Sequence, residues 1–142
     1  MKNKIRSRLI KIARNCLGAP YKYGAKPEDA PKCFDCSSFT QYIYKKIGLK
    51  LPRSSILQAA QGRNIEMEDG EWRLSVGDLL FWRGDKGHYD DSLFGGEPIY
   101  IGHVAMYLGD GKIIQASSAA RSVSEKLLAE VKEPIALVKR IL

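Results

Sequence analysis

The chain has 142 residues, a length typical of one domain, so we expect a single domain over residues 1–142. Charged residues make up 27% and apolar residues 44%, a balance that excludes disordered and collagen-like chains. No apolar run reaches the roughly 18 residues of a membrane-spanning helix, so we expect no membrane span. The net charge is +7, and residues 1–27 hold eight basic residues and no acidic one. Such a segment attracts anionic polymers, but no nucleic-acid-binding motif accompanies it, so we expect no nucleic acid partner.

The N-terminus is basic, but it lacks the apolar stretch of about 7–15 residues that marks a secretory signal peptide. We therefore expect a protein that is cytoplasmic as synthesised. An action outside the cell would require another export route.

The first half of the chain predicts helices and one loop. Apolar residues at helical spacing predict an amphipathic helix over 5–16. Three prolines mark 19–32 as a loop. A second helix is expected from residue 35 or 36 to residue 48, where a glycine ends it. A serine cap predicts a short helix over 54–61.

The second half of the chain predicts strands, turns and one more helix. The segments are a strand over 78–82, a long loop over 83–98, a hairpin of 99–108 and 112–117 around Gly109-Asp110-Gly111, a helix over 124–132 and a last strand over 134–142. Helices come first and strands follow. This order indicates an α+β fold with N-terminal helices packed on a small antiparallel β-sheet.

Cys36 is the strongest candidate for a catalytic residue, because it lies in the first turn of the second predicted helix. The unpaired N–H groups and the dipole at a helix start favour an anion, so they favour the nucleophilic thiolate. Asp35, the predicted N-cap, opposes this effect, so a cationic partner is needed. His103 is the candidate, since a histidine can hold a thiolate as an ion pair and later protonate a leaving amine. Each residue type is more often structural when taken alone, and only the fold can join the two.

The register of the predicted hairpin decides whether Gln115 reaches His103. A two-residue loop turns Gln115 away from His103, whereas a three-residue loop over 109–111 places Ala105 opposite Gln115 and Ser117 opposite His103. We predict the three-residue loop, because a glycine suits its third position. Gln115 is then a diagonal neighbour of His103, and its amide oxygen can hold a ring N–H. The alternative is a polar residue on a solvent-facing strand.

Cys33 and Cys36 form a C-x-x-C pair, which leaves two other interpretations open. With His88 and His103 they would form a zinc-binding module, although the spacing of the two histidines is poor for zinc. A reversible disulfide between Cys33 and Cys36 would switch a Cys36 enzyme off under oxidation. The simpler alternatives are a surface position for His88 and incidental proximity for Cys33.

Five blocks of sequence extend almost end to end along the chain. They are Gly18-Ala-Pro-Tyr21-Lys-Tyr-Gly24, Phe34-Asp-Cys36-Ser-Ser-Phe, Leu51-Pro-Arg-Ser-Ser55, Gly77-Asp-Leu-Leu-Phe81 and His103-Val-Ala-Met-Tyr-Leu-Gly109-Asp-Gly-Lys-Ile-Ile-Gln115-Ala. Together and in this order they resemble the NlpC-type (NlpC/p-sixty) cell-wall cysteine endopeptidases, which have a papain-like fold.

The resemblance implies a role for each matched residue. Cys36 corresponds to the nucleophile, His103 to the general base and acid, and Gln115 to a third polar position that is often histidine. Tyr21 corresponds to a tyrosine that lines the catalytic cleft and supports the oxyanion. Asp35 and Ser37 correspond to residues that bind the amine end of the substrate. Arg53 corresponds to a basic residue of the Leu-Pro-Arg block and is a further candidate for substrate binding.

The family hydrolyses the γ-D-glutamyl–diaminopimelate bond, or the equivalent lysine bond, in peptidoglycan stem peptides. The resemblance therefore implies a thiol protease without a metal or other cofactor that acts on peptidoglycan or muropeptides as a monomer. It would reach the cell wall by an unknown export route or act on recycled muropeptides. Two alternatives stay open: the same residues acting on a non-wall amide or thioester, and a catalytically silent wall-binding domain.

The chain departs from the family pattern at four places, one of which is Ala25, which follows Gly24 where two glycines are common. Ser38 stands where a glycine usually follows Asp-Cys-Ser, and Gln115 stands where histidine is common. The stretch 84–98 is longer than the usual connection before the histidine. It is expected to form a wall or lid of the cleft, or alternatively a solvent loop.

Overall fold

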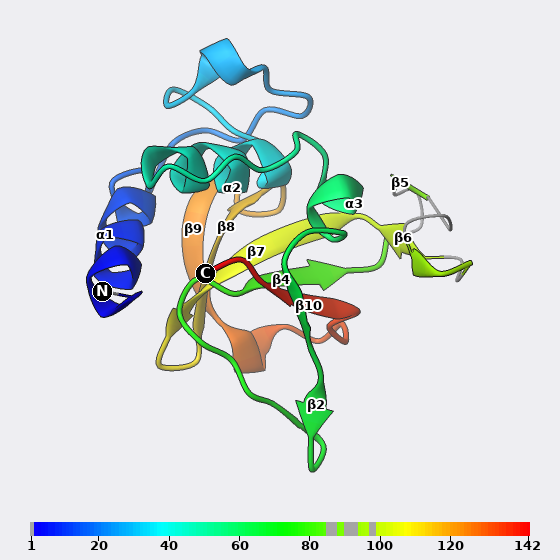
Figure 1. The fold of residues 1–142 in the computed structure, drawn as a ribbon. Helices are drawn as coiled ribbons and strands as arrows, with labels where there is room; N and C mark the ends of the chain where they lie inside the picture. The colour runs from blue at the N-terminus through cyan, green and yellow to red at the C-terminus, as the bar shows by residue number, and fades with distance from the viewer. Residues whose placement is uncertain (1, 85–87, 90–93, 97–98) are drawn as a thin grey trace.

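The computed structural model describes residues 2–84, 88–89, 94–96 and 99–142. Its helices are α1 (Lys2–Arg14), α2 (Cys36–Lys46), α3 (Ser55–Gln58) and the short 3-10 helices η1 (Pro27–Asp29) and η3 (Leu128–Glu130). Figure 1 shows α1 and α2 on one side of a β-sheet, with α2 lying over the strands. Within the described ranges, no helix combines the length and the apolar character that crossing a membrane requires.

Within the described residues, the main sheet has six strands in the order β1-β10-β4-β7-β8-β9, and all neighbours are antiparallel. The strands of this sheet are β1 (Arg63–Ile65), β4 (Leu79–Trp82), β7 (His103–Gly109), β8 (Lys112–Ser117), β9 (Ser122–Leu127) and β10 (Leu137–Arg140). Two small pairs are β2 (Met67–Glu68) with β3 (Glu71–Trp72), and β5 (His88–Tyr89) with β6 (Tyr100–Ile101). The predicted α+β fold with N-terminal helices on an antiparallel sheet is confirmed.

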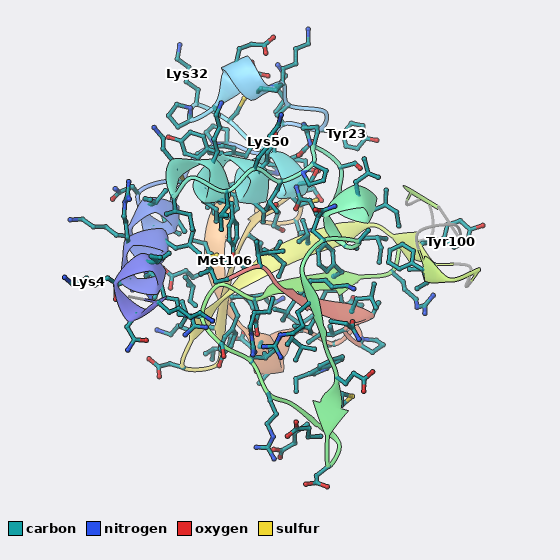
Figure 2. All side chains as sticks on the ribbon, viewed as in Figure 1. Lys4, Tyr23, Lys32, Lys50, Tyr100 and Met106 are labelled. Carbon is teal, nitrogen blue, oxygen red and sulfur yellow. The ribbon has the colours of Figure 1, made fainter. Side chains whose placement is uncertain are left out.

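Apolar side chains fill both faces of the sheet. Leu9 of α1, Ile43 of α2 and Met106 of β7 are fully buried between the helices and the sheet. Figure 2 shows Met106 in the interior, whereas Lys4 and Lys32 extend outward. The cluster on the opposite face consists of Ile65, Leu80, Trp82, Ala105, Ile113 and Val138. Burial of the first cluster fixes the sheet against α1 and α2, because removing apolar surface from water contributes roughly 25 cal/mol per Å².

The β7–β8 hairpin has the register that the sequence predicts. Met106 lies opposite Ile114, and Tyr107 lies opposite Ile113. These pairs belong to the same register as the predicted pair of residues 105 and 115, because each step forward on β7 is matched by one step back on β8. The register therefore places Gln115 on the same face as the first residue of β7.

The turn of this hairpin differs from the prediction. Asp110 and Gly111 form a two-residue turn with positive φ values of 51° and 73°, and Gly109 lies opposite Lys112. The register shifts just before Gly109, so a β-bulge at Leu108 supplies the extra residue that the prediction places in the loop. Bulge and longer loop have the same effect on the register.

The predicted helix over 124–132 is wrong. Residues 122–127 form β9, which pairs with β8 along its whole length, and only Leu128–Glu130 adopt a 3-10 turn. The segment contains good helix formers, but β8 offers it a free edge. The ladder hydrogen bonds along that edge, together with burial of Val123, outweigh local helix propensity.

Smaller differences concern short elements. The helix expected over 54–61 ends at Gln58, and strands β1, β2, β3 and β5 were not predicted. The single strand expected over 99–108 is divided into β6 and β7, which belong to different sheets. Strands of two or three residues are too short for alternation to reveal them. Part of the loop predicted over 83–98, and with it the expected cleft wall or lid, lies outside the described residues.

Candidate active site

Cys36 is the first residue of α2, and a capping box fixes where that helix begins. The Asp35 carboxylate accepts a hydrogen bond from the Ser38 backbone N–H at 2.9 Å, and the Ser38 hydroxyl accepts one from the Asp35 backbone N–H at 2.9 Å. A bridge between Tyr21 and Phe34 brings the Tyr21 segment beside this helix start. The local sequence thus presents the Cys36 thiol at the N-terminus of α2, as predicted.

His103 is the first residue of β7, and its imidazole is held by Gln115 of β8. The His103 Nε2 lies 2.6 Å from the Gln115 Oε1. Because an amide oxygen only accepts, this contact assigns the proton to Nε2 and leaves Nδ1 free to take a proton. Trp82, opposite His103 on β4, packs against the imidazole with 5.7 Å between ring centroids. Two neighbouring strands therefore fix the orientation of the ring.

A pocket of about 440 Å³ brings four of the predicted residues together. Its lining includes Tyr21, Cys36, His103 and Gln115. These residues come from the loop before α2, from α2 and from two strands of the sheet. A nucleophile, a proton carrier and a group that orients this carrier therefore meet at one solvent-accessible pocket.

Burial sets the charge state of the two central groups. Desolvation raises the pKa of the Cys36 thiol, and the backbone N–H groups of Val104 and Ser37 offset this only in part. Desolvation also lowers the pKa of His103, against the hydrogen bond that its Nε2–H donates to Gln115, which raises this pKa. Taken separately, burial thus favours the neutral thiol and the neutral imidazole, against the thiolate that the helix start alone would favour.

Asp35, Ser37 and Arg53 form a hydrogen-bonded network beside this pocket and are not part of its lining. The Arg53 Nη2 lies 2.7 Å from the Asp35 Oδ2 and donates to the Ala25 carbonyl, while Nη1 donates to the Ser37 Oγ at 2.8 Å. The Gly24 N–H also donates to the Asp35 Oδ2, at 3.2 Å. Burial acts to raise the pKa of Asp35, but the hydrogen bond and charge of Arg53 outweigh it and hold this pKa below its usual value.

Trp82, Lys126 and Glu133 also line the catalytic pocket, and sequence reasoning missed all three. The Trp82 Nε1–H donates to the Glu133 carbonyl at 3.2 Å, so the chain after η3 is tied to β4. Trp82 could have been found by pairing the predicted strand over 78–82 with the strand that carries His103. Lys126 could not, because the prediction placed it on a helix.

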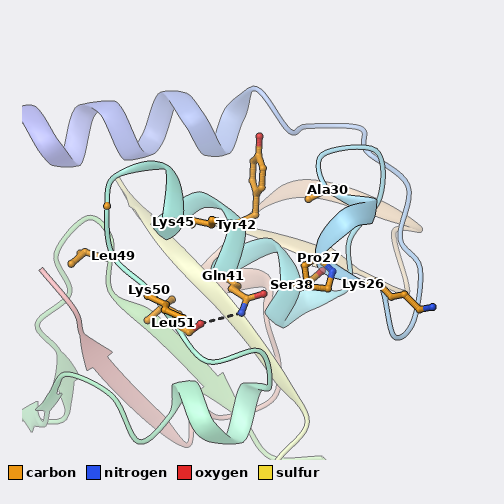
Figure 3. Close-up of a pocket in the computed structure, with 11 residues that line it drawn as sticks. Lys26, Pro27, Ala30, Ser38, Gln41, Tyr42, Lys45, Leu49, Lys50 and Leu51 are labelled. Carbon is orange, nitrogen blue, oxygen red and sulfur yellow. Dashed lines mark hydrogen bonds between the residues drawn. The ribbon is translucent and has the colours of Figure 1, made fainter.

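A larger cavity of about 560 Å³ lies on the outer face of α2, between the loops over 26–30 and 48–51 (Figure 3). Neither Cys36 nor His103 lines it. The larger cavity therefore lacks the predicted site residues, and the smaller pocket is the candidate active site because of the chemistry of its lining.

The two other interpretations of the cysteines stay untested. Across the described residues, no three His, Cys, Asp or Glu side chains lie close enough to hold a metal ion. The side chain of His88, a proposed zinc ligand, lies outside the described part of the structure. Cys33 and Cys36 are free thiols, so a disulfide switch between them remains a prediction.

Comparison with known proteins gives the family. The model of the NlpC/P60 family matches residues 18–135. A γ-D-glutamyl-L-lysine dipeptidyl-peptidase of Bacillus cereus is 36% identical over 115 residues, which cover 81% of this chain and 29% of that protein. The chain spans less than half the length of the curated relatives it matches.

Solved structures show the same relationship. An NlpC/P60 family protein from Bacillus cereus matches with a TM-score of 0.75 and 33% identity, over 96% of this chain and 40% of the other. The peptidoglycan hydrolase RipB from Mycobacterium tuberculosis matches with a TM-score of 0.69 and 26% identity, over 99% of this chain and 66% of the other. Fold, sequence and family model agree, and the chain belongs to the NlpC/P60 family.

Proposed function

We propose that the chain is a cysteine peptidase that hydrolyses peptidoglycan stem peptides at the γ-D-glutamyl–diaminopimelate bond or the equivalent lysine bond. The observation that carries this proposal is one pocket lined by Cys36 and by the hydrogen-bonded pair His103 and Gln115. Acyl transfer by a thiol requires this set of groups. The names of two relatives, a γ-D-glutamyl-L-lysine dipeptidyl-peptidase and a peptidoglycan hydrolase, support the substrate class.

His103 acts first as a base. Because Gln115 holds its Nε2–H, its Nδ1 accepts the thiol proton as the Cys36 sulfur attacks the peptide carbonyl carbon. Burial disfavours each charge separately, but thiolate and imidazolium form together and attract each other. The new S–C bond moves the carbonyl electron pair onto oxygen. Backbone N–H groups at the start of α2, with the Tyr21 hydroxyl, stabilise this oxyanion.

His103 then acts as an acid. Its Nδ1–H protonates the peptide nitrogen, the C–N bond breaks, and the amine product leaves a thioester on Cys36. Water attacks the thioester carbonyl while His103 takes one of its protons. The C–S bond breaks, the acid product leaves, and the proton returns to the sulfur.

The network beside the pocket is proposed to bind the amine end of the stem peptide. Asp35 and Ser37 flank the nucleophile in sequence, so a peptide seated at Cys36 passes close to both. Arg53 forms the salt bridge to Asp35 and the hydrogen bond to Ser37, so it positions these two side chains and balances the carboxylate charge.

The setting of the reaction also remains a proposal. We propose a monomer that acts either on the wall, after export by an unknown route, or on muropeptides recycled into the cytoplasm. The excess of basic residues in the first 27 positions would favour contact with anionic wall material.

The test is mass spectrometry of defined muropeptides, with and without a free N-terminal L-Ala, incubated with wild type and with Cys36→Ala. Wild type should release products cut after D-Glu, and Cys36→Ala should release none. A preference for the free amine would assign the activity to recycled peptides, because such an amine is absent from stem peptides attached to the intact wall.

Cys33→Ser is the matched control, because Cys33 is a free thiol that does not line the pocket. This variant should cleave as wild type does. If it is also as sensitive to peroxide as wild type, the disulfide switch is refuted. Absence of cleavage by wild type would overturn the proposal: a Cys36 that still reacts with alkylating agents would then indicate another acyl substrate, and an inert Cys36 a silent domain.

A further inference from the structure

The lining of the candidate catalytic pocket includes charged residues that the proposed mechanism does not use. These are Arg83, Lys126 and Glu133, which we call the charged wall. Lys126 lies on β9 two residues after Ser124, which is opposite Gln115 on β8. Since side chains alternate between the faces of a sheet, Lys126 and Gln115 lie on the same face. Lys126 is opposite Ile113 and therefore lies one step farther from His103 than Gln115 does, along the same strand pair.

Glu133 reaches this wall by a different contact. Its backbone carbonyl accepts the Nε1–H of Trp82 at 3.2 Å, and the Trp82 ring packs against the His103 ring. One indole thus separates the backbone of Glu133 from the catalytic imidazole. Trp82 is almost completely buried, so this anchor holds the Glu133 segment in place.

The wall lies where the leaving group must sit. His103 protonates the nitrogen of the bond that breaks, so the residue attached to that nitrogen is on the His103 side of the carbonyl. The same pocket is lined by His103 and Gln115 and also by Lys126 and Glu133. The side chain of the leaving residue therefore meets the charges of this wall.

The two leaving residues that the proposed function allows differ in charge at this point. The side chain of lysine ends in an ammonium alone, whereas that of diaminopimelate ends in an ammonium and a carboxylate. Lys126 is exposed and, among the residues described, forms no salt bridge, so its ammonium is available to a ligand. Two cations and one anion on the wall favour a ligand that brings a carboxylate.

We propose that Lys126 selects diaminopimelate over lysine as the leaving residue by binding its side-chain carboxylate, while Glu133 binds the side-chain ammonium that both residues carry. This inference rests on the proposed function and narrows its substrate. A lysine peptide leaves Lys126 without a counter-charge and adds an ammonium near it, whereas a diaminopimelate peptide satisfies both residues.

The test compares kcat/KM for two synthetic peptides, L-Ala-γ-D-Glu-diaminopimelate and L-Ala-γ-D-Glu-L-Lys. Wild type should prefer the diaminopimelate peptide. Lys126→Met keeps the length of the side chain and removes its charge, so the preference should fall about fivefold, chiefly through KM. Lys126→Glu should reverse the preference. Glu133→Gln should slow both peptides by the same factor, because both carry the ammonium.

Lys112→Ala is the matched control, since Lys112 is an exposed lysine on β8 that does not line the pocket. Its ratio of kcat/KM values should equal that of wild type. An equal ratio in wild type and Lys126→Met, with both peptides cleaved, would overturn this inference and leave the proposed function standing. Cleavage of neither peptide by wild type would overturn both.

Discussion

Two opposing effects act on the pKa of His103. Burial lowers its pKa, because a buried imidazolium loses its hydration, and the Gln115 amide oxygen raises it by accepting the Nε2–H. The net pKa lies below the ordinary value of 6.5, so the imidazole is neutral at neutral pH and ready to accept a proton. A glutamine orients the ring without the negative charge that a carboxylate would add.

Replacing Gln115 should shift the acidic limb of the pH profile of kcat/KM, and the direction of the shift should depend on which residue replaces it. Gln115→Ala removes the contact that raises the pKa of His103, so the limb should move to lower pH, and kcat should fall roughly tenfold or more because the ring loses its orientation. Gln115→Glu adds a carboxylate that stabilises the imidazolium, so the limb should move to higher pH. The measurement is kcat/KM against pH on one muropeptide.

Ser124 provides the control, because it lies opposite Gln115 on β9. Ser124→Ala changes the same strand pair but removes no hydrogen bond to the imidazole, so the limb should stay in place. A limb that moves the same way in both Gln115 variants would contradict the argument that the charge at this position tunes His103.

At the level of helices and strands, the sequence predicted correctly those elements whose ends are determined by residues within the element itself. α2 begins where expected, because Asp35 and Ser38 form a capping box within the segment. The β7–β8 register was predictable because turn and bulge lie within the hairpin. Residues 122–127 form a strand because they pair with the edge of β8. The residue pattern within 122–127 cannot predict this, because it carries no information about a strand elsewhere in the chain.

The start of β7 next to β4 depends on a glycine. A Cβ on Gly102 would lie 2.8 Å from the Gly84 Cα, and a backbone atom cannot rotate aside. The Gly102 N–H also donates to the Trp82 carbonyl, and His103 follows directly in sequence. Gly102→Ala should therefore displace the imidazole and lower kcat/KM about 100-fold, while the melting temperature falls by only a few degrees. Kinetics and thermal unfolding of the same preparation check this.

Gly48→Ala serves as the matched variant for this experiment. Gly48 has a φ of +87° with nothing near its Cβ position, so an alanine strains the backbone after α2 without a collision. Its melting temperature should also fall, but kcat/KM should stay close to wild type. Equal losses of activity in the two variants would show that general destabilisation, and not displacement of His103, causes the effect.

At the scale of the whole molecule, the site forms only when distant segments meet. Resemblance and hairpin register indicated Cys36, His103 and Gln115, and the structure places all three in one pocket. The charged wall with Lys126 and Glu133 was not predictable, because it is built from an edge strand and from a segment held by the Trp82 hydrogen bond. The residues of this charged wall therefore meet only through tertiary contacts, which no local pattern in the sequence reveals.

One buried salt bridge joins the strand that carries Trp82 to the last strand of the chain. The Asp78 carboxylate is 1% exposed and accepts two hydrogen bonds from Arg140, from Nε and Nη2, both at 2.8 Å. Asp78→Asn leaves the largely buried guanidinium without its counter-charge. We expect the free energy of unfolding to fall by about 3 kcal/mol and the melting temperature by roughly 10 °C. Urea denaturation measures the loss as a lower midpoint at an unchanged slope.

Glu125→Gln makes the same chemical change in an exposed pair, because Glu125 forms a salt bridge with Arg14 on the surface. That variant should lose less than about 1 kcal/mol, since water screens both charges. If the two variants lose the same amount, the Asp78–Arg140 pair does not hold the last strand against β4.

If Asp78→Asn loses more, as we expect, it should also lower kcat at temperatures well below unfolding, because β10 supports the strand on which Trp82 orients His103.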